Sequence, residues 1–302
     1  MQNIEVAAGK VIKAAFGQNA LELIKAIRFL GPYRLFKSWR EINSRQVPQN
    51  FPRTLSICAI MKNEGPYLQE WIEYHHLAGV EKFYLYDNGS TDRTQDIIKP
   101  YVTSGLVEYT YFPIDKPQIP AYKDCIDRHM MDSEWLAFID LDEFIVPVQS
   151  MSIKDSLPSS ATISQIVINW LIFGSNGQTK RLPGYVMERF TKRGTRHWLS
   201  KTIVNPRKIH KIGVHEHIVS GRTLHPGIDQ IRINHYHCKS WEEYQLKAAK
   251  GDVLFGRENG PLKYARKCFD EHDLNDISDL TILKFLNALN AQINSSRLTQ
   301  NK

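Results

Sequence analysis

The chain has 302 residues, of which 42% are hydrophobic and 24% are charged. This composition is typical of a folded globular protein and excludes a largely disordered chain. No run reaches the roughly 18 consecutive apolar residues that a membrane-spanning helix needs, and the N-terminus lacks the pattern of a secretory signal peptide. We therefore expect a cytoplasmic protein. Its four cysteines form no CxxC pair, so buried thiols are expected rather than disulfides or a zinc site.

The formal net charge is +7, and it is unevenly distributed. Residues 1–45 contain eight basic and three acidic residues, a net +5, which leaves +2 for the rest of the chain. A basic excess of this kind is compatible with nucleic acid, an anionic membrane or a phosphorylated substrate as partner.

Residues 1–50 are predicted to form a basic, amphipathic helical segment. Gly31-Pro32 interrupts the helical pattern, and Tyr33 to Ile42 combines aromatic with basic residues. Such a helix either lies on an anionic membrane surface or packs on the rest of the protein, and the sequence leaves both open. The proline-rich stretch 47–52 is expected to be a linker.

From Thr54 the pattern changes to short apolar runs that alternate with helical stretches. It predicts strands at 55–61, 82–86, 107–112 and 135–139, and helices at 67–78, 91–101 and 122–131. This alternation indicates an α/β fold with a parallel sheet, in which ligands bind at the carboxyl ends of the strands. Residues 51–150 are therefore expected to bind a nucleotide.

Beyond Pro147 the pattern is less regular. Strands are predicted at 163–172, 186–190, 202–204 and 230–236, a loop at 173–177, and helices at 241–251 and 280–293. Residues 151–260 are interpreted as an acceptor-binding half that completes a metal site. Residues 261–302 are interpreted as a C-terminal helical segment.

Two carboxylates directly follow the predicted strand at 135–139, in the run Asp140-Leu141-Asp142-Glu143-Phe144. Buried carboxylates need a cation, and oxygen ligands of this type suit Mg²⁺ or Mn²⁺. A further acid, Asp87, directly follows the strand at 82–86 and precedes Asn88-Gly89-Ser90-Thr91-Asp92. Its carboxylate can accept hydrogen bonds from a base or ribose, while Ser90 and Asp92 cap the turn.

These motifs together carry a family resemblance. Met61-Lys62-Asn63-Glu64, the helix that contains Tyr67 to His75, and the two acidic motifs resemble, in order and spacing, GT-A-fold glycosyltransferases of the family 2-like and family 92-like groups. The resemblance implies a three-layer α/β/α nucleotide-diphospho-sugar transferase fold with terminal helical appendages. It also implies a nucleotide-sugar donor, with a UDP-sugar favoured. The implied roles are nucleotide binding by Asn63, Glu64, Asp87 and Asn88, and metal binding by Asp140 and Asp142.

The second half matches the family more loosely. The segment after Trp170 that contains Gly174, Ser175 and Asn176 looks like an acceptor-side loop. In Asn234-His235-Tyr236-His237-Cys238-Lys239, a histidine is similar to the C-terminal metal ligand of GT-A enzymes, and Lys239 to their phosphate-binding lysine. His235 is favoured over His237, but the two lie on one face of the predicted strand and the sequence does not separate them.

A base that deprotonates the acceptor hydroxyl is the least defined part of the site. This chain lacks the acidic pair that many GT-A enzymes carry after the position of Trp170, which leaves Glu188 and Glu216 as the nearest candidates. The cluster His215-Glu216-His217 fits no standard zinc spacing. The basic residues Lys201, Arg207, Lys208 and Lys211 are expected to include some that face the acceptor or a phosphate, although most of them are expected to be solvated surface charges.

The predicted function is a metal-dependent, inverting glycosyltransferase that acts on a glycan or glycolipid acceptor in surface polysaccharide or lipopolysaccharide synthesis. It would use Mn²⁺ or Mg²⁺ and work in the cytoplasm, with contact to the inner face of an anionic membrane. Nucleic acid is not expected as a partner, because acids at strand ends repel phosphate unless a metal intervenes. The alternatives are a nucleotidyltransferase on the same core and a non-catalytic protein that binds polyanions or membranes.

Overall fold

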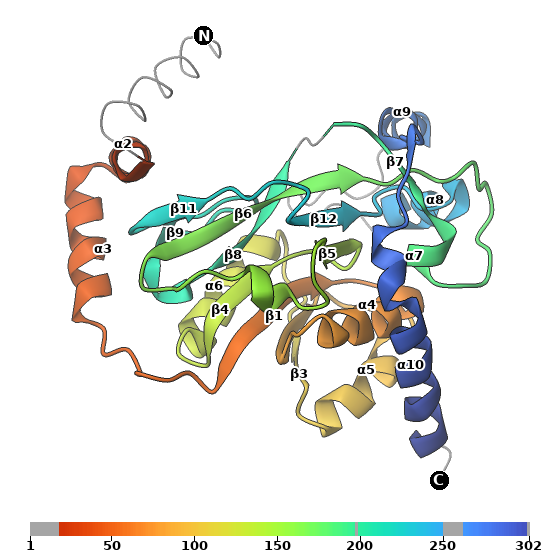
Figure 1. The fold of residues 1–302 in the computed structure, drawn as a ribbon, viewed down its shortest axis with the longest axis horizontal. Helices are drawn as coiled ribbons and strands as arrows, with labels where there is room; N and C mark the ends of the chain where they lie inside the picture. Colours follow the sequence, from red (N-terminus) through yellow and green to blue (C-terminus); the bar gives the residue numbers. More distant parts are fainter. Residues whose placement is uncertain (1–17, 197–198, 250–261, 301–302) are drawn as a thin grey trace.

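A curved, nine-stranded mixed sheet forms the centre of the described chain (Figure 1). The computed structural model describes residues 18–196, 199–249 and 262–300. The sheet order is β3-β2-β1-β4-β8-β6-β12-β5, and β11 pairs with β6. The strands of this sheet are β1 Arg53–Met61, β2 Lys82–Asp87, β3 Val107–Tyr111, β4 Ser133–Phe138, β5 Glu143–Pro147, β6 Ile163–Ile172, β8 Ser200–Val204, β11 Arg222–Leu224 and β12 Ile231–His235.

Helices and short strand pairs surround this sheet. The helices are α2 Gln18–Leu30, α3 Pro32–Ser44, α4 Gly65–Leu77, α5 Thr94–Thr103, α6 Gln118–His129, α7 Val186–Arg189, α8 Trp241–Ala249, α9 Leu262–His272 and α10 Leu286–Gln300. Three 3₁₀ helices span Ile153–Ser156, Pro206–Lys208 and Thr281–Phe285. Two small antiparallel pairs join β9 Ile209–Lys211 to β10 Ile218–Val219, and β7 Lys192–Arg193 to β13 Ile277–Ser278.

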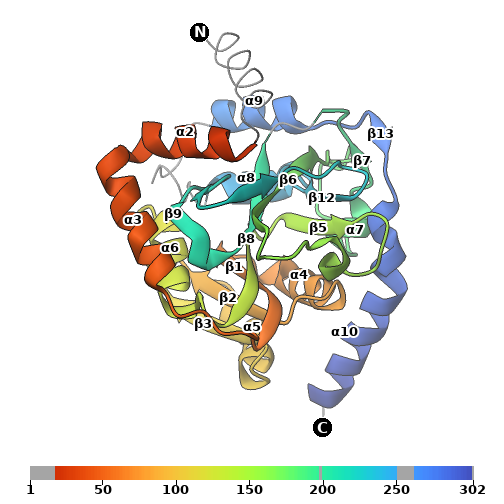
Figure 2. The same cartoon turned by 60° about the vertical axis from the view of Figure 1, so that its left-hand side comes forward.

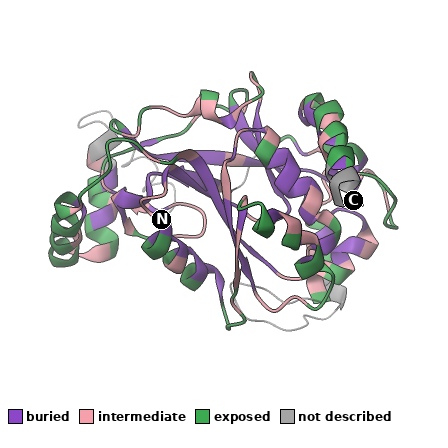
Figure 3. Cartoon of the chain, turned by 90° about the horizontal axis from the view of Figure 1, so that it is seen from below, coloured by how far each residue is buried: buried purple, intermediate pink, exposed green. Residues whose placement is uncertain are grey.

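The first half of the sheet is parallel and is covered by helices on both faces. Successive residues of β1 point to opposite sides: Ile57 and Ala59 pack in the cluster that includes α4 and α5, whereas Cys58 and Ile60 pack in the cluster that includes α6. Strands β1, β2 and β4 are largely buried, β3 at the sheet edge is partly exposed, and the outer helix faces are exposed (Figure 3). The predicted three-layer α/β architecture is therefore confirmed.

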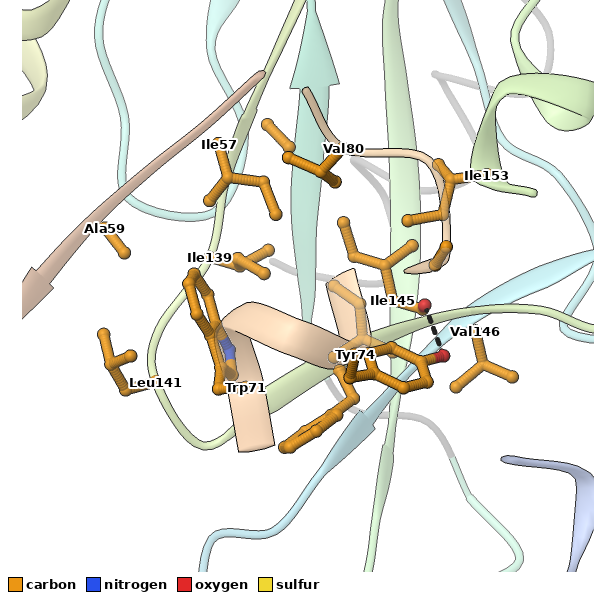
Figure 4. Packing of buried hydrophobic residues seen from close by; sticks show 14 of the residues in the cluster. Ile57, Ala59, Trp71, Tyr74, Val80, Ile139, Leu141, Ile145, Val146 and Ile153 are labelled. Carbon is orange, nitrogen blue, oxygen red and sulfur yellow. Dashed lines mark hydrogen bonds between the residues drawn. The ribbon is translucent and has the colours of Figure 1, made fainter. Parts of the chain in front are cut away.

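The second half of the sheet mixes strand directions. β8 runs antiparallel between β4 and β6, β12 runs parallel to β6, and β5 runs antiparallel to β12. Two side chains of helix α4 hydrogen-bond to the backbone of β5. The Tyr74 hydroxyl donates to the carbonyl of Ile145 (2.9 Å; Figure 4), and the Trp71 indole N–H donates to that of Glu143 (2.8 Å). The turn between β4 and β5 is thus held next to the end of β12.

Two predicted elements differ in the structure. The segment 186–190, predicted as a strand, is the short helix α7. The buried carboxylate of Glu70 accepts the backbone N–H groups of Val186 (2.7 Å) and Met187 (3.0 Å), and so satisfies two donors that open this helix. One strand, β5, was not predicted, and it begins at Glu143 and Phe144. The predicted helix at 280–293 starts as a 3₁₀ helix before α10.

The other predicted elements lie within a few residues of their observed positions, and the linker at 47–52 forms no helix or strand. The predicted helical residues Val11 to Phe16 lie outside the described part of the chain. Three cysteines are buried free thiols, and Cys268 is a partly exposed one. None of the described helices is long and apolar enough to cross a bilayer.

The N-terminal helices α2 and α3 pack at one end of the sheet, beside β9, β10 and β11 (Figure 2). The chain bends between them at Gly31, which has a φ of 74°, and Pro32 opens α3. Polar contacts hold them in place: Lys25 pairs with Glu216 (3.2 Å), Ser38 bonds His210 (2.8 Å), and Arg45 donates to the carbonyl of Arg207 (2.6 Å).

Candidate functional site

The two acids of the turn between β4 and β5 point to different partners. Asp140 meets Lys201 of β8, whose ammonium lies 2.8 Å from Oδ2, and its Oδ1 accepts from Gln118 of α6 (3.3 Å). Asp142 turns instead toward the end of β12 and α8, where it meets His235 and Lys247. The side chain of Asp140 is 31% exposed and that of Asp142 is 10% exposed. Although only one residue stands between the two acids, each forms its own ion pair with a different lysine.

Asp142, His235 and His237 form the candidate metal centre. One ligand atom of each lies within 4.8 Å of the others. The strand pairing explains this: β12 lies antiparallel to β5, and Glu143 is directly opposite His235. The backbone N–H of Tyr236 also donates to the carbonyl of Asp142 (2.8 Å). The sequence left open whether His235 or His237 is the metal ligand. In the structure both imidazoles lie beside Asp142, so both are candidate ligands.

The electrostatics of this centre keep the histidines neutral. Burial lowers the pKa of His235, although Asp142 opposes this, and burial together with Lys247 holds the pKa of His237 well below its ordinary value. Burial by itself would raise the pKa of Asp142, but Lys247 and His235 outweigh it and hold that pKa well below its usual range. The centre therefore offers one ionised carboxylate and two neutral imidazoles.

This donor set fits a divalent cation. A neutral imidazole is a ligand for transition metals, and a carboxylate supplies the charge. The Nδ1 atom of His235 is buried without a hydrogen-bond partner among the described residues, which leaves that ring with a ligand atom unused by the protein. Asp140, predicted as a ligand, is outside this group of three, because Lys201 engages it.

Lys247 is part of the same centre. Its Nζ lies 2.6 Å from Oδ2 of Asp142 and 3.2 Å from Nδ1 of His237. Burial would lower the pKa of Lys247, but Asp142 outweighs it and raises that pKa. Lys247 stands 105 positions after Asp142 and was not predicted as part of the site. A lysine in the last turn of the helix that follows the His-x-His motif was the only local signal.

Lys201 is the centre of a second cluster of ionisable side chains, which also contains Asp140 and Glu143. Its side chain is 1% exposed, and its ammonium lies 2.8 Å from Asp140 and 4.0 Å from Glu143. Burial would lower the pKa of Lys201, but these carboxylates raise it, while burial raises the pKa of Glu143 well above its ordinary value. Lys201 and Asp140, whose charged atoms are 2.8 Å apart, form the closer ion pair of this group. The expectation that such basic residues are solvated is wrong for Lys201.

Arg207 is also buried rather than solvated, for a structural reason. Its guanidinium donates to the backbone carbonyls of Met130, Ser133 and Glu134, at 2.6 to 2.7 Å, and stacks over Phe51. The Arg207 side chain therefore stabilises the connection between α6 and β4 through these backbone carbonyls.

The residues predicted to bind the nucleotide shape the turns at the ends of β1 and β2. The carboxylate of Asp87 accepts from the N–H of Ser90 and the hydroxyl of Tyr109, both at 2.7 Å. The Asn63 side chain accepts from the N–H of Thr91 (2.7 Å), and Asn88 donates to the carbonyls of Phe112 (3.0 Å) and Ile114 (2.8 Å). Glu64 lies next to Asn63, directly before α4. Their role toward a nucleotide remains a prediction.

Lys239 has a positive φ of 51° and is 6% exposed. Its ammonium lies 4.3 Å from the centre of the Tyr67 ring. The Tyr67 hydroxyl donates to Glu243 (2.8 Å), which also pairs with Arg189. The charge of Lys239 helps to lower the pKa of Asp142, after the larger effects of Lys247 and His235. Lys239 thus adds positive charge beside the metal centre.

Trp170 lies against the metal centre, whereas the rest of the predicted acceptor loop is tied to the C-terminal segment. The rings of Trp170 and His235 are 4.3 Å apart. The Ser175 N–H and hydroxyl donate to Asp273, and the Asn176 N–H donates to Asn275 (2.9 Å). A Cβ on Gly174 would come within 2.5 Å of the carbonyl of Leu274. These contacts define the shape of the loop.

Both base candidates have structural partners. Glu188 accepts from the N–H of Tyr185 (3.4 Å) and so caps α7, while Glu216 pairs with Lys25 of α2. The neighbours of Glu216 diverge: His215 packs on Trp170, and His217 packs on Phe138. A catalytic role for either glutamate remains a prediction.

Comparisons with known proteins give these residues a context. A sequence profile described as Glycosyltransferase family 92 matches residues 53–282. A family 92 protein of Ricinus communis is 27% identical over 207 residues, which are 65% of this chain and 37% of the relative. A galactan β-1,4-galactosyltransferase of Arabidopsis thaliana is 26% identical over 250 residues, 75% of this chain and 49% of the relative. The resemblance predicted from the sequence is thereby confirmed.

The chain spans about a third to about a half of the length of these curated relatives. Among solved structures, S. aureus TarS 1–349 in complex with UDP-GlcNAc superposes with a TM-score of 0.38 at 13% identity. That superposition covers 72% of this chain and 71% of the other.

Proposed function

Because the chain belongs to glycosyltransferase family 92, we propose that it transfers a sugar from a nucleoside-diphosphate donor to a hydroxyl group of a glycan or glycolipid. One observation carries this proposal beyond the family: the buried centre of Asp142, His235 and His237. It lies where the turn after β4 meets the end of β12, at the edge of the sheet where the parallel strands β1, β2 and β4 also end.

The proposal includes a divalent metal at this centre. Mn²⁺ suits a set of two imidazoles and one carboxylate better than Mg²⁺, which prefers oxygen ligands and keeps several waters. When bound, the ion supplies positive charge that stabilises a departing diphosphate. Lys239, buried beside the centre, adds a fixed positive charge for the same leaving group.

Galactose is the first donor sugar to test, because a relative is named a galactan β-1,4-galactosyltransferase. Nucleoside-diphosphate galactose carries an α anomeric bond, so a β-linked product corresponds to inversion. This supports the inverting outcome in the proposal. Inversion needs a base on the acceptor side, for which Glu188 and Glu216 remain the candidates that the sequence supplies. The acceptor is proposed to belong to a surface polysaccharide or lipopolysaccharide.

The proposal also includes contact with the inner face of a membrane. Seven large apolar side chains of α2 and α3 are at least 42% exposed, and they are Leu23, Ile24, Ile27, Phe29, Tyr33, Phe36 and Trp39. We call these seven residues the α2–α3 apolar face. Basic side chains flank them, and they are Arg28, Arg34, Lys37 and Arg40, all exposed. Exposed aromatic groups with flanking positive charge are typical of helices that lie on anionic membranes.

Donor screening tests the proposed activity. Purified protein is incubated with a panel of nucleotide sugars and Mn²⁺, and release of the nucleoside diphosphate is measured. We expect release with one class of sugar nucleotide and a loss of at least about a hundredfold in Asp142→Asn. Asp96→Asn is the control, because Asp96 is an exposed acid on α5. Full turnover by Asp142→Asn would exclude the assigned centre, and pyrophosphate release from a nucleoside triphosphate would indicate a nucleotidyltransferase.

A further inference from the structure

The ammonium of Lys247 lies where a metal ion would be bound. It is within 2.6 Å of Asp142 Oδ2 and 3.2 Å of His237 Nδ1, so it contacts two of the three side chains that could ligate the ion. It also donates to the carbonyl of His237 (3.4 Å). An ordinary ion pair would need only the carboxylate, whereas this ammonium also bonds an imidazole nitrogen.

We propose that Lys247 is a built-in counter-ion that competes with the divalent ion, and that ion binding displaces its ammonium from Asp142. This inference rests on the metal-binding role proposed above. Asp142 is buried, and a buried carboxylate is costly without a cation. Lys247 supplies that cation in the metal-free protein and so stabilises a centre whose ligands are already in place.

Lysine and metal cannot share the centre. An ammonium and a divalent ion that contact the same carboxylate would be a few ångströms apart and would repel each other strongly at a buried site. The Lys247 side chain is 35% exposed and four carbons long, so it can swing toward solvent while α8 stays folded. The metal affinity of the protein therefore includes the cost of breaking the Lys247–Asp142 contact.

Titration with Mn²⁺ alone, in the absence of any nucleotide, tests the inference. Isothermal calorimetry and the electron paramagnetic resonance signal of free Mn²⁺ both report the dissociation constant of the full chain. We expect Lys247→Met to bind Mn²⁺ at least about tenfold more tightly than the wild type, because the competitor is gone. Lys247→Arg, which keeps the charge, should bind no more tightly than the wild type.

The matched control is Lys99→Met. Lys99 is an exposed lysine in the middle of α5, so its removal changes the net charge equally without touching the centre. This variant should keep the wild-type affinity. If it bound Mn²⁺ as tightly as Lys247→Met, the effect would be one of net charge and the inference would be overturned.

Thermal unfolding provides a second readout. Without metal, Lys247→Met should have a lower Tm than the wild type, because Asp142 loses its cation, and Mn²⁺ should raise its Tm by more than it raises that of the wild type. Equal or weaker Mn²⁺ binding by Lys247→Met, with clear binding by the wild type, would overturn the inference and leave the proposed function intact. No binding by either protein would overturn both the inference and the proposed metal centre.

Discussion

Lys201 and Asp140 form an ion pair of 2.8 Å in which the lysine is almost completely buried and the acid is partly exposed. The pair joins β8 to the turn after β4, and the ring of Trp170 lies 5.9 Å from the same ammonium. Asp140 is thus held by the protein itself, on the opposite side of the turn from the metal centre at Asp142.

Removal of Lys201 should destabilise the protein. Lys201→Met leaves Asp140 without its cation, and we expect the free energy of unfolding to fall by about 2 kcal/mol, less than the roughly 3–5 kcal/mol of a fully buried pair because Asp140 can still be hydrated. Urea denaturation at pH 7 measures this. Lys99→Met serves as the reference variant and should stay within about 0.5 kcal/mol of the wild type. An unchanged urea midpoint in Lys201→Met would contradict the importance of the pair.

Acid should destabilise the fold through His75. This ring is fully buried and neutral: Nδ1 lies 2.9 Å from the carbonyl of Trp71, and Nε2 accepts the N–H of Ile145 (3.2 Å). Burial lowers its pKa to about 3. Because the folded pKa is below the unfolded value of about 6.5, the unfolded chain binds an extra proton between these values. The contribution of His75 is complete above pH 6.5 and is lost as the pH falls toward 3.

The measurement is the free energy of unfolding from pH 7 down to pH 5, in the wild type and in His75→Gln. The wild type should lose up to about 1.4 kcal/mol per pH unit through His75, and His75→Gln should show a correspondingly smaller slope. His76→Gln, a substitution at the neighbouring, less buried ring, should keep the wild-type slope. Identical slopes in all three proteins would contradict this prediction.

Both histidines of the metal centre should contribute to ion binding. His235→Ala and His237→Ala should each weaken Mn²⁺ binding by about tenfold or more, because each removes one ligand atom from the group. The titration without nucleotide measures this, with His76→Ala as the control. If only one variant lost affinity, the other histidine would be a packing residue, and the assignment of the three-residue centre would be wrong.

The α2–α3 apolar face should bind vesicles that contain an anionic phospholipid. The double substitution Phe36→Ser and Trp39→Ser removes two exposed aromatic groups, and we expect sedimentation with such vesicles to fall at least about tenfold. Binding by the wild type should also weaken as salt rises. Val102→Ser removes an exposed apolar side chain from α5 and is the control.

Two results would exclude a membrane as the partner of this face. One is equal sedimentation of the double variant and the wild type. The other is a concentration-dependent dimer in the wild type that the double variant abolishes, with no vesicle binding by either, which would assign the α2–α3 apolar face to a second copy of the chain.

Much of the fold and part of the site could be predicted from local patterns. The strands β1 to β4 are short apolar runs, Asp87 is the last residue of β2, and Asp140 and Asp142 lie in the turn after β4. Alternating burial along a strand and capped turns between elements are properties of neighbouring residues, so they are visible without a structure. The interrupted helix at Gly31-Pro32 is another such case.

Contacts between distant residues were not predictable in this way. The α/β class, the acids at the strand ends and the family were all predicted from local sequence patterns. The tertiary structure was needed to show that residues 186–189 are helical, because Glu70 lies more than a hundred residues away from the N–H groups it accepts. It also decided that Asp140 and Asp142 separate toward Lys201 and Lys247, because the sheet order brings β8 and β12 to opposite sides of one turn. Ion pairs depend on distance in space, and no local pattern encodes that distance.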